Sequence, residues 1–111
     1  SSLALIRATG TAVDEATVTG GGTRSAAWMQ MLADALDCRM LLREGADAGP
    51  ALGGARLALV GACGQSVAEA CRPGPVVASY APQADAVAAY RSVAARFDGL
   101  YPCLAEHFHA L

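Results

Sequence analysis

The sequence predicts an α/β fold that is incomplete within its 111 residues. Two runs typical of β-strands, Ala16 to Thr19 and Arg39 to Arg43, flank a segment with helical periodicity, which predicts two parallel strands joined by a right-handed crossover. A parallel pair needs neighbouring strands and helices on both faces. The remaining chain predicts further helices and no further strand. With 54% hydrophobic and only 16% charged residues, we expect part of its apolar surface to be covered by other polypeptide, as in the tail of a larger protein.

The first elements lead to a run of three glycines. Ser2 to Ala8 has the pattern of the end of a helix, with Thr9 and Gly10 as its stop. After the first strand come Gly20, Gly21 and Gly22, and then a second helix. Consecutive glycines between a strand and a helix indicate either a tight turn or a ligand lying against bare backbone. The pattern alone leaves both interpretations open, because it is neither a dinucleotide-binding motif nor a P-loop.

The helix after the glycines is predicted from about Ser25 to Asp37. One apolar face carries Trp28, Met31, Leu32, Ala35 and Leu36, and we interpret it as core packing. Gln30, Asp34 and Asp37 lie mostly off that face. Thr23 or Ser25 is suited to cap the helix.

A third helix is predicted from Pro50, after a turn at Glu44 to Gly49. Residues 51–63 are almost all apolar or small, which is typical of a helix buried on several sides. Gly53 and Gly54 in this helix suggest that another backbone approaches closely. The sequence then predicts a short helical turn at 66–71, a loop at 72–82, which contains three prolines, and helices at 85–98 and 100–108.

Composition narrows the class of protein. A net charge of −2 gives no basic surface for nucleic acid. The apolar run at 46–64 is too broken to span a bilayer. Cys38, Cys63, Cys71 and Cys103 show no metal-ligand spacing, and scattered thiols without a secretory leader favour small buried side chains in a cytoplasmic protein over disulfides. His107 and His109 lie on different helix faces, so we expect no metal site there.

Three motifs together resemble one family. VTGGGTRSAAWMQMLADALD, DAGPALGGARLALVGA and FDGLYPCLAEHF are similar, in this order, to the C-terminal part of the FGGY carbohydrate kinases, and most similar to their xylulokinase branch. The resemblance implies a partial actin-like (ribonuclease H-like) ATPase lobe. Residues 1–111 would form the C-terminal portion of the second, nucleotide-binding domain. Within it, residues 1–71 would be a βαβα core and residues 72–111 a C-terminal loop and helices.

The resemblance also implies a function. The full protein would be an ATP-dependent kinase that phosphorylates a pentulose such as xylulose, and this segment would supply the adenosine side of the ATP site. Gly21 and Gly22 match glycines that lie against the nucleotide. Ser25 matches a position that contacts adenine in glycerol kinases, and Thr23 is a neighbouring candidate. For Thr23 and Ser25, helix capping alone is an equally good explanation.

The segment carries no catalytic residue that matches the family. Phosphoryl transfer needs a base, a phosphate cradle and carboxylates that place Mg²⁺, and the family's motifs for these come earlier in the chain. We therefore expect ATP/ADP and the sugar to be partners, with Mg²⁺ and the sugar held by the preceding part; the family also allows a homodimer. Two alternatives remain: a non-catalytic regulatory or scaffolding piece of the same superfamily, and a stand-alone α/β binding module.

Overall fold

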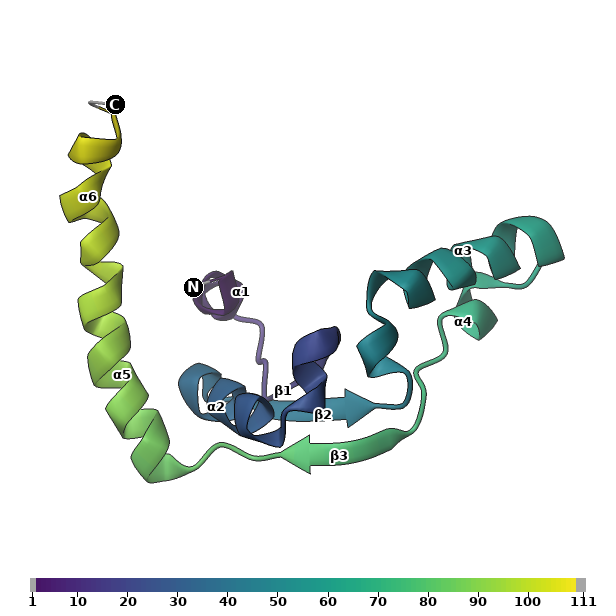
Figure 1. The fold of residues 1–111 in the computed structure, drawn as a ribbon, viewed down its shortest axis with the longest axis horizontal. Coiled ribbons are helices and arrows are strands. Elements are labelled where there is room, and N and C mark those ends of the chain that lie inside the picture. Colours follow the sequence, from purple (N-terminus) through teal and green to yellow (C-terminus); the bar gives the residue numbers. More distant parts are fainter. Residues whose placement is uncertain (1, 110–111) are drawn as a thin grey trace.

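A computed structural model describes residues 2–109 of the chain (Figure 1). It contains three strands, six α-helices and two short 3₁₀-helices among these residues. In chain order they are α1 (Ser2–Ala8), β1 (Glu15–Val18), η1 (Gly21–Arg24), α2 (Ala26–Leu36), β2 (Arg39–Arg43), η2 (Ala46–Ala48), α3 (Pro50–Cys63), α4 (Val67–Ala70), β3 (Val76–Tyr80), α5 (Ala84–Asp98) and α6 (Leu100–His109).

The strands form one mixed sheet in the order β1-β2-β3. β1 and β2 are parallel, with Ala16 opposite Met40, so the predicted strand–helix–strand unit is confirmed. β3 pairs with the other edge of β2 in the antiparallel direction, with Met40 opposite Tyr80. The expectation of only two strands was therefore wrong, because part of the predicted loop at 72–82 is a strand.

The prolines explain why β3 was missed. Pro73, Pro75 and Pro82 lie outside the strand, which is the run VVASY between them. Proline cannot donate to a β-ladder, so prolines beside a short run of β-prone residues mark the ends of an edge strand rather than a loop. The carbonyl oxygen of Pro75 accepts a hydrogen bond of 3.0 Å from the backbone N–H of Glu44, which ties the start of β3 to the end of β2.

The core lies between α2 and one face of the sheet. Its fully buried side chains are Met29, Ala33, Cys38 and Met40. Leu32 and Leu36 pack against this cluster, as the helical spacing predicted. Trp28 does not, since 47% of its surface is exposed. Met31 and Ala35 are exposed as well. The predicted core role of these three residues was therefore wrong, because the helix turns Met29 and Ala33 toward the sheet instead.

A carboxylate joins α2 to α5. Asp34, expected off the apolar face, is only 6% exposed. Its Oδ1 accepts hydrogen bonds from Nε2 of Gln30 at 2.9 Å and from the backbone N–H of Gln83 at 2.8 Å. Gln83 is the residue that precedes α5. The buried charge is therefore satisfied by donors, and it fixes the end of β3 and the start of α5 against α2.

Helix α3 begins at Pro50, as predicted, and ends at Cys63, followed by the cap residue Gly64 with a left-handed φ of 66°. The expectation that α3 is buried on several sides was wrong for the described chain, because none of its residues is buried. Leu57 is 75% exposed. The predicted close approach at Gly53 and Gly54 is also not seen, since no other group lies within 4 Å of a Cβ built there.

Two helical arms extend from opposite ends of the strands (Figure 1). α3 and α4 follow the carboxyl end of β2, whereas α5 and α6 follow β3 at the other end. The radius of gyration is 17.9 Å, whereas a compact domain of this length has about 13 Å. This open shape agrees with the prediction of an incomplete lobe. No helix in the described part of the chain is long and apolar enough to cross a membrane.

Candidate functional site

Two glycine-containing turns meet at one edge of the sheet. β1 leads into Gly20 and η1, and β2 leads into Gly45 and η2. Because the two strands are parallel, their carboxyl ends lie at the same edge of the sheet, and the two turns therefore lie side by side. The N–H of Gly20 donates a hydrogen bond of 2.7 Å to the carbonyl of Ala46. A Cβ at Gly49 would lie 3.7 Å from Cα of Gly20. In open α/β sheets ligands bind beyond the carboxyl ends of the strands, where these turns lie.

The three predicted loop glycines have different surroundings. Gly20 has a φ of 105°, which side chains other than hydrogen rarely allow. Gly22 has an ordinary φ, but a Cβ there would lie 3.0 Å from the indole of Trp28. Gly21 has an ordinary φ and no other group within 4 Å of a built Cβ. The backbone conformation therefore accounts for a glycine at position 20, and the nearby indole favours a glycine at position 22. Neither reason applies at position 21.

Thr23 and Ser25 use their hydroxyl groups locally. Thr23 is buried, and its Oγ1 donates a 2.6 Å hydrogen bond to the carbonyl of Gly20. Ser25 is the N-cap of α2, and its Oγ accepts a 3.2 Å hydrogen bond from the backbone N–H of Trp28. Both side chains thus stabilise the turn and the start of α2. Their assignment as nucleotide contacts stays a prediction.

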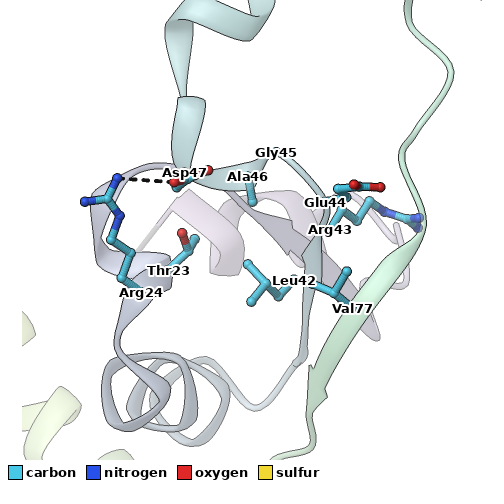
Figure 2. Close-up of a pocket in the computed structure, with 9 residues that line it drawn as sticks. All are labelled: Thr23, Arg24, Leu42, Arg43, Glu44, Gly45, Ala46, Asp47 and Val77. Carbon is cyan, nitrogen blue, oxygen red and sulfur yellow. Dashed lines mark hydrogen bonds and ion pairs between the residues drawn. The ribbon is translucent and has the colours of Figure 1, made fainter.

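A cavity of about 330 Å³ opens between the two turns (Figure 2). Thr23 and Arg24 of η1 border one side, and residues of β2, of the turn after it, of η2 and of β3 form the rest. Of the four predicted site residues, Thr23 lines this cavity, whereas Gly21, Gly22 and Ser25 do not. The lining residues are Thr23, Arg24, Leu42, Arg43, Glu44, Gly45, Ala46, Asp47 and Val77. The carbon atoms of Leu42, Ala46 and Val77 give this space an apolar wall, and charged groups lie around its rim (Figure 2).

The charges around this cavity are balanced. Nη2 of Arg24 lies 3.2 Å from Oδ2 of Asp47 and links η1 to η2 (Figure 2). Both side chains are largely exposed, so the pair contributes little to stability. Arg43 donates from Nε to Oγ1 of Thr17 at 3.3 Å and from Nη1 to the carbonyl of Gly74 at 2.8 Å. Arg43 therefore fixes the end of β2 to both neighbouring segments.

Sequence reasoning missed two parts of this site. The segment Glu44 to Gly49 was interpreted as a plain turn, although the parallel pairing of the strands brings it beside Gly20 to Gly22. That pairing was itself predicted, and it would have placed both turns at one edge. Trp28 was assigned to the core, whereas its indole lies against Gly22. Helical periodicity alone does not show which of two adjacent apolar residues faces the sheet.

The groups with shifted pKa values lie outside the cavity lining. Burial raises the pKa of the Cys38 thiol, and hydrogen bonds from Ser66 lower the pKa of the Glu69 carboxyl. All four cysteines are free thiols, but only Cys38 is buried, so the prediction of small buried side chains was wrong for Cys63, Cys71 and Cys103. Within the described residues no three His, Cys, Asp or Glu side chains are grouped so as to hold a metal ion.

The chain is similar in sequence and in structure to known carbohydrate kinases. Residues 2–62 match the FGGY family of carbohydrate kinases, C-terminal domain. The chain is 40% identical over 98 residues to the xylulose kinase of Escherichia coli (strain K12), an alignment that covers 87% of this chain and 20% of that protein. A crystal structure of a xyloylose kinase from Brucella ovis superimposes with a TM-score of 0.72 and 33% identity, covering 95% of this chain and 22% of the other. The chain thus spans about a fifth of the length of these relatives.

Proposed function

Since the chain belongs to the FGGY family of carbohydrate kinases, we propose that it supplies the adenosine side of the ATP site in a sugar kinase. The cavity beyond the carboxyl ends of β1 and β2 is the place where this part of the nucleotide would lie. The nucleotide would extend from this cavity, at Thr23, to the neighbouring Gly21 and lie against its backbone, while Gly22 and Ser25 would complete the turn. Residues 1–111 would then be the C-terminal portion of the second, nucleotide-binding domain.

One observation carries this proposal. Gly21 costs backbone entropy without a conformational or packing reason within the described structure. Of the three glycines in the turn, Gly21 is the one for which the described residues give no such reason, and this supports the approach of another molecule to its bare backbone. The turn also precedes the N-terminus of α2, whose partial positive charge suits the polar edge of a ligand. The residues present therefore fit a nucleotide.

The substrate and the remaining partners follow from the relatives. The two proteins compared above are described as xylulose or xyloylose kinases, and we extend this to a pentulose such as xylulose as the phosphate acceptor. Mg²⁺ and the sugar would be held by the rest of the polypeptide, where the base and the phosphate cradle would also lie. When bound, ATP supplies the phosphoryl group. We also propose a cytoplasmic location and a homodimer as the oligomeric state.

The test is a substitution of Gly21 by valine in the full-length protein. A branched side chain would enter the space of the nucleotide, so we expect ATP binding to weaken at least ~10-fold, equivalent to about 1.4 kcal/mol. Sugar binding should stay unchanged. Titration calorimetry with ATP and with xylulose measures both affinities.

A matched control is Gly61→Val in α3. Gly61 also has an ordinary φ and no other group within 4 Å of a built Cβ, but it lies away from the glycine turn. This variant should bind ATP as the parent protein does. Equal losses of ATP and sugar affinity in Gly21→Val would contradict the assignment, because they would indicate a general defect in folding.

A further inference from the structure

Gly22 lies close to the indole of Trp28, and the proposed ATP site does not by itself assign a function to this tryptophan. A Cβ at residue 22 would lie 3.0 Å from both Cδ1 and Nε1 of the Trp28 indole, with Cε2 at 3.9 Å. Contacts of 3.0 Å are closer than side chains tolerate without movement. The φ of Gly22 is one that any residue can adopt. A side chain at position 22 would therefore need the indole to shift by a few tenths of an ångström, and glycine avoids this shift.

The position of Trp28 explains how this contact arises. Trp28 is the third residue of α2, and its backbone N–H is held by Oγ of the cap residue Ser25. Long side chains on a helix point back toward its N-terminus, which here is the glycine turn. The indole thus lies beside the turn that precedes its helix, and 47% of its surface remains exposed instead of entering the core.

We propose that Trp28 is a positioning residue for the nucleotide and that Gly22 serves Trp28 rather than the ligand. The indole supports the turn from the side of Gly22, and this support fixes the conformation in which Gly21 presents its bare backbone. The inference rests on the proposed function and refines it, because it divides the two glycines between a ligand contact at Gly21 and a packing contact at Gly22.

The space around the turn agrees with this division. Gly20 and Gly21 have no other group within 4 Å of a built Cβ, whereas Gly22 has three atoms of one side chain there. The other end of the turn is held by the hydrogen bond from Gly20 to Ala46. The turn is thereby fixed at both ends, and Gly21 between them is left open.

A double-mutant cycle in the full-length protein tests the proposal. The variants are Gly22→Ala, Trp28→Leu and the two combined, with Trp28→Phe as the conservative replacement. The readouts are the KM values for ATP and for the sugar, together with the melting temperature. Trp28→Leu should raise the KM for ATP about 5-fold and leave that for the sugar unchanged, as expected when one support of a binding turn is lost. Trp28→Phe should restore most of this loss.

The combined variant gives the decisive comparison. Gly22→Ala alone should raise the KM for ATP and lower the melting temperature, because the methyl group displaces the indole. In the Trp28→Leu background the same alanine should have little further effect, since the indole is gone. Such non-additivity is the mark of a direct contact. If the alanine has its full effect in both backgrounds, the nucleotide itself meets Gly22 and the proposal is wrong.

Other outcomes separate this proposal from the one on which it depends. A wild-type KM for ATP in Trp28→Leu, with a loss in Gly21→Val, would overturn the role of Trp28 and leave the ATP site in place. Parallel increases in both KM values in Trp28→Leu would also overturn it, because they indicate a general structural defect. A full-length protein that does not bind ATP in calorimetry would overturn both proposals.

Discussion

The side chain of Arg7 in α1 caps the C-terminus of α2, which lies about 30 residues further along the chain. Helix α2 ends at Leu36, and Asp37 follows with a left-handed φ of 47°. The guanidinium of Arg7 donates hydrogen bonds to the carbonyls of Leu36 at 3.0 Å, Asp37 at 2.8 Å and Val13 at 2.9 Å. The last carbonyls of a helix lack partners within it and carry partial negative charge. Arg7 satisfies the last carbonyl of the helix, that of Leu36, and the one that follows it, and ties α1 to the end of α2.

We expect Arg7→Met in the full-length protein to lower the free energy of unfolding by about 1–2 kcal/mol, because three carbonyls lose a charged donor that water only partly replaces. Urea denaturation measures the change. Arg39→Met is the control, since Arg39 is exposed and its side chain makes no hydrogen bond that the described residues show. If the two variants are equally stable, the carbonyls at the end of α2 do not depend on Arg7.

Local sequence patterns predicted where helices and strands begin and end better than they predicted which residues these helices and strands bury. The bounds of β2 and α3 agree with the sequence analysis, because periodicity and the proline at position 50 are local signals. β3 was missed because prolines flank it, and the core face of α2 was misassigned because adjacent apolar residues compete for the sheet. For the site, the sequence located the glycine turn. It could not show that Gly20 has a left-handed φ or that Gly22 lies close to the indole of Trp28, since both depend on tertiary structure.

The junction of α2, β3 and α5 provides a prediction at this scale. Asp34→Ala should lower the free energy of unfolding by about 1–3 kcal/mol, because the backbone N–H of Gln83 and the side-chain amide of Gln30 both lose the buried carboxyl group as acceptor. Asp34→Asn should cost less, since its amide oxygen can still accept that hydrogen bond. Differential scanning calorimetry of the full-length variants measures both changes.

Asp85→Ala is the control for charge, because Asp85 lies exposed in the first turn of α5. Its removal affects only the interaction with the helix dipole, about 0.3–1 kcal/mol. Asp34→Ala and Asp85→Ala with equal effects would mean that Asp34 acts through its charge alone and not as the acceptor that joins the two helices.

In the described residues, α2 and the sheet form two layers with the core between them. α2 covers the face of the sheet that carries Ala16, Met40 and Tyr80. The opposite face carries Thr17, Leu41 and Ser79; Leu41 on the central strand is buried, whereas Thr17 and Ser79 on the outer strands are exposed. α/β sheets with parallel strands are normally covered on both faces. The large apolar side chains exposed on the helices of both arms are Leu57, Leu59, Val67, Val93, Phe97, Leu100 and Leu104. Since the relatives are about five times as long, we expect further polypeptide to cover these surfaces.

A charged residue introduced on α3 tests whether other polypeptide covers this helix in the full-length protein or whether it faces solvent. Leu57 is 75% exposed in the described structure, and a substitution at such a position changes stability by only about 0.5 kcal/mol. If the rest of the polypeptide packs on α3, Leu57→Lys in the full-length protein must bury a charge or disrupt the contact, and the free energy of unfolding should fall by more than ~2 kcal/mol. Gln65→Lys is the control, because Gln65 is polar and exposed just beyond the same helix. Thermal unfolding of both variants measures the difference, and equal melting temperatures would mean that α3 faces solvent in the whole protein as it does in these 111 residues.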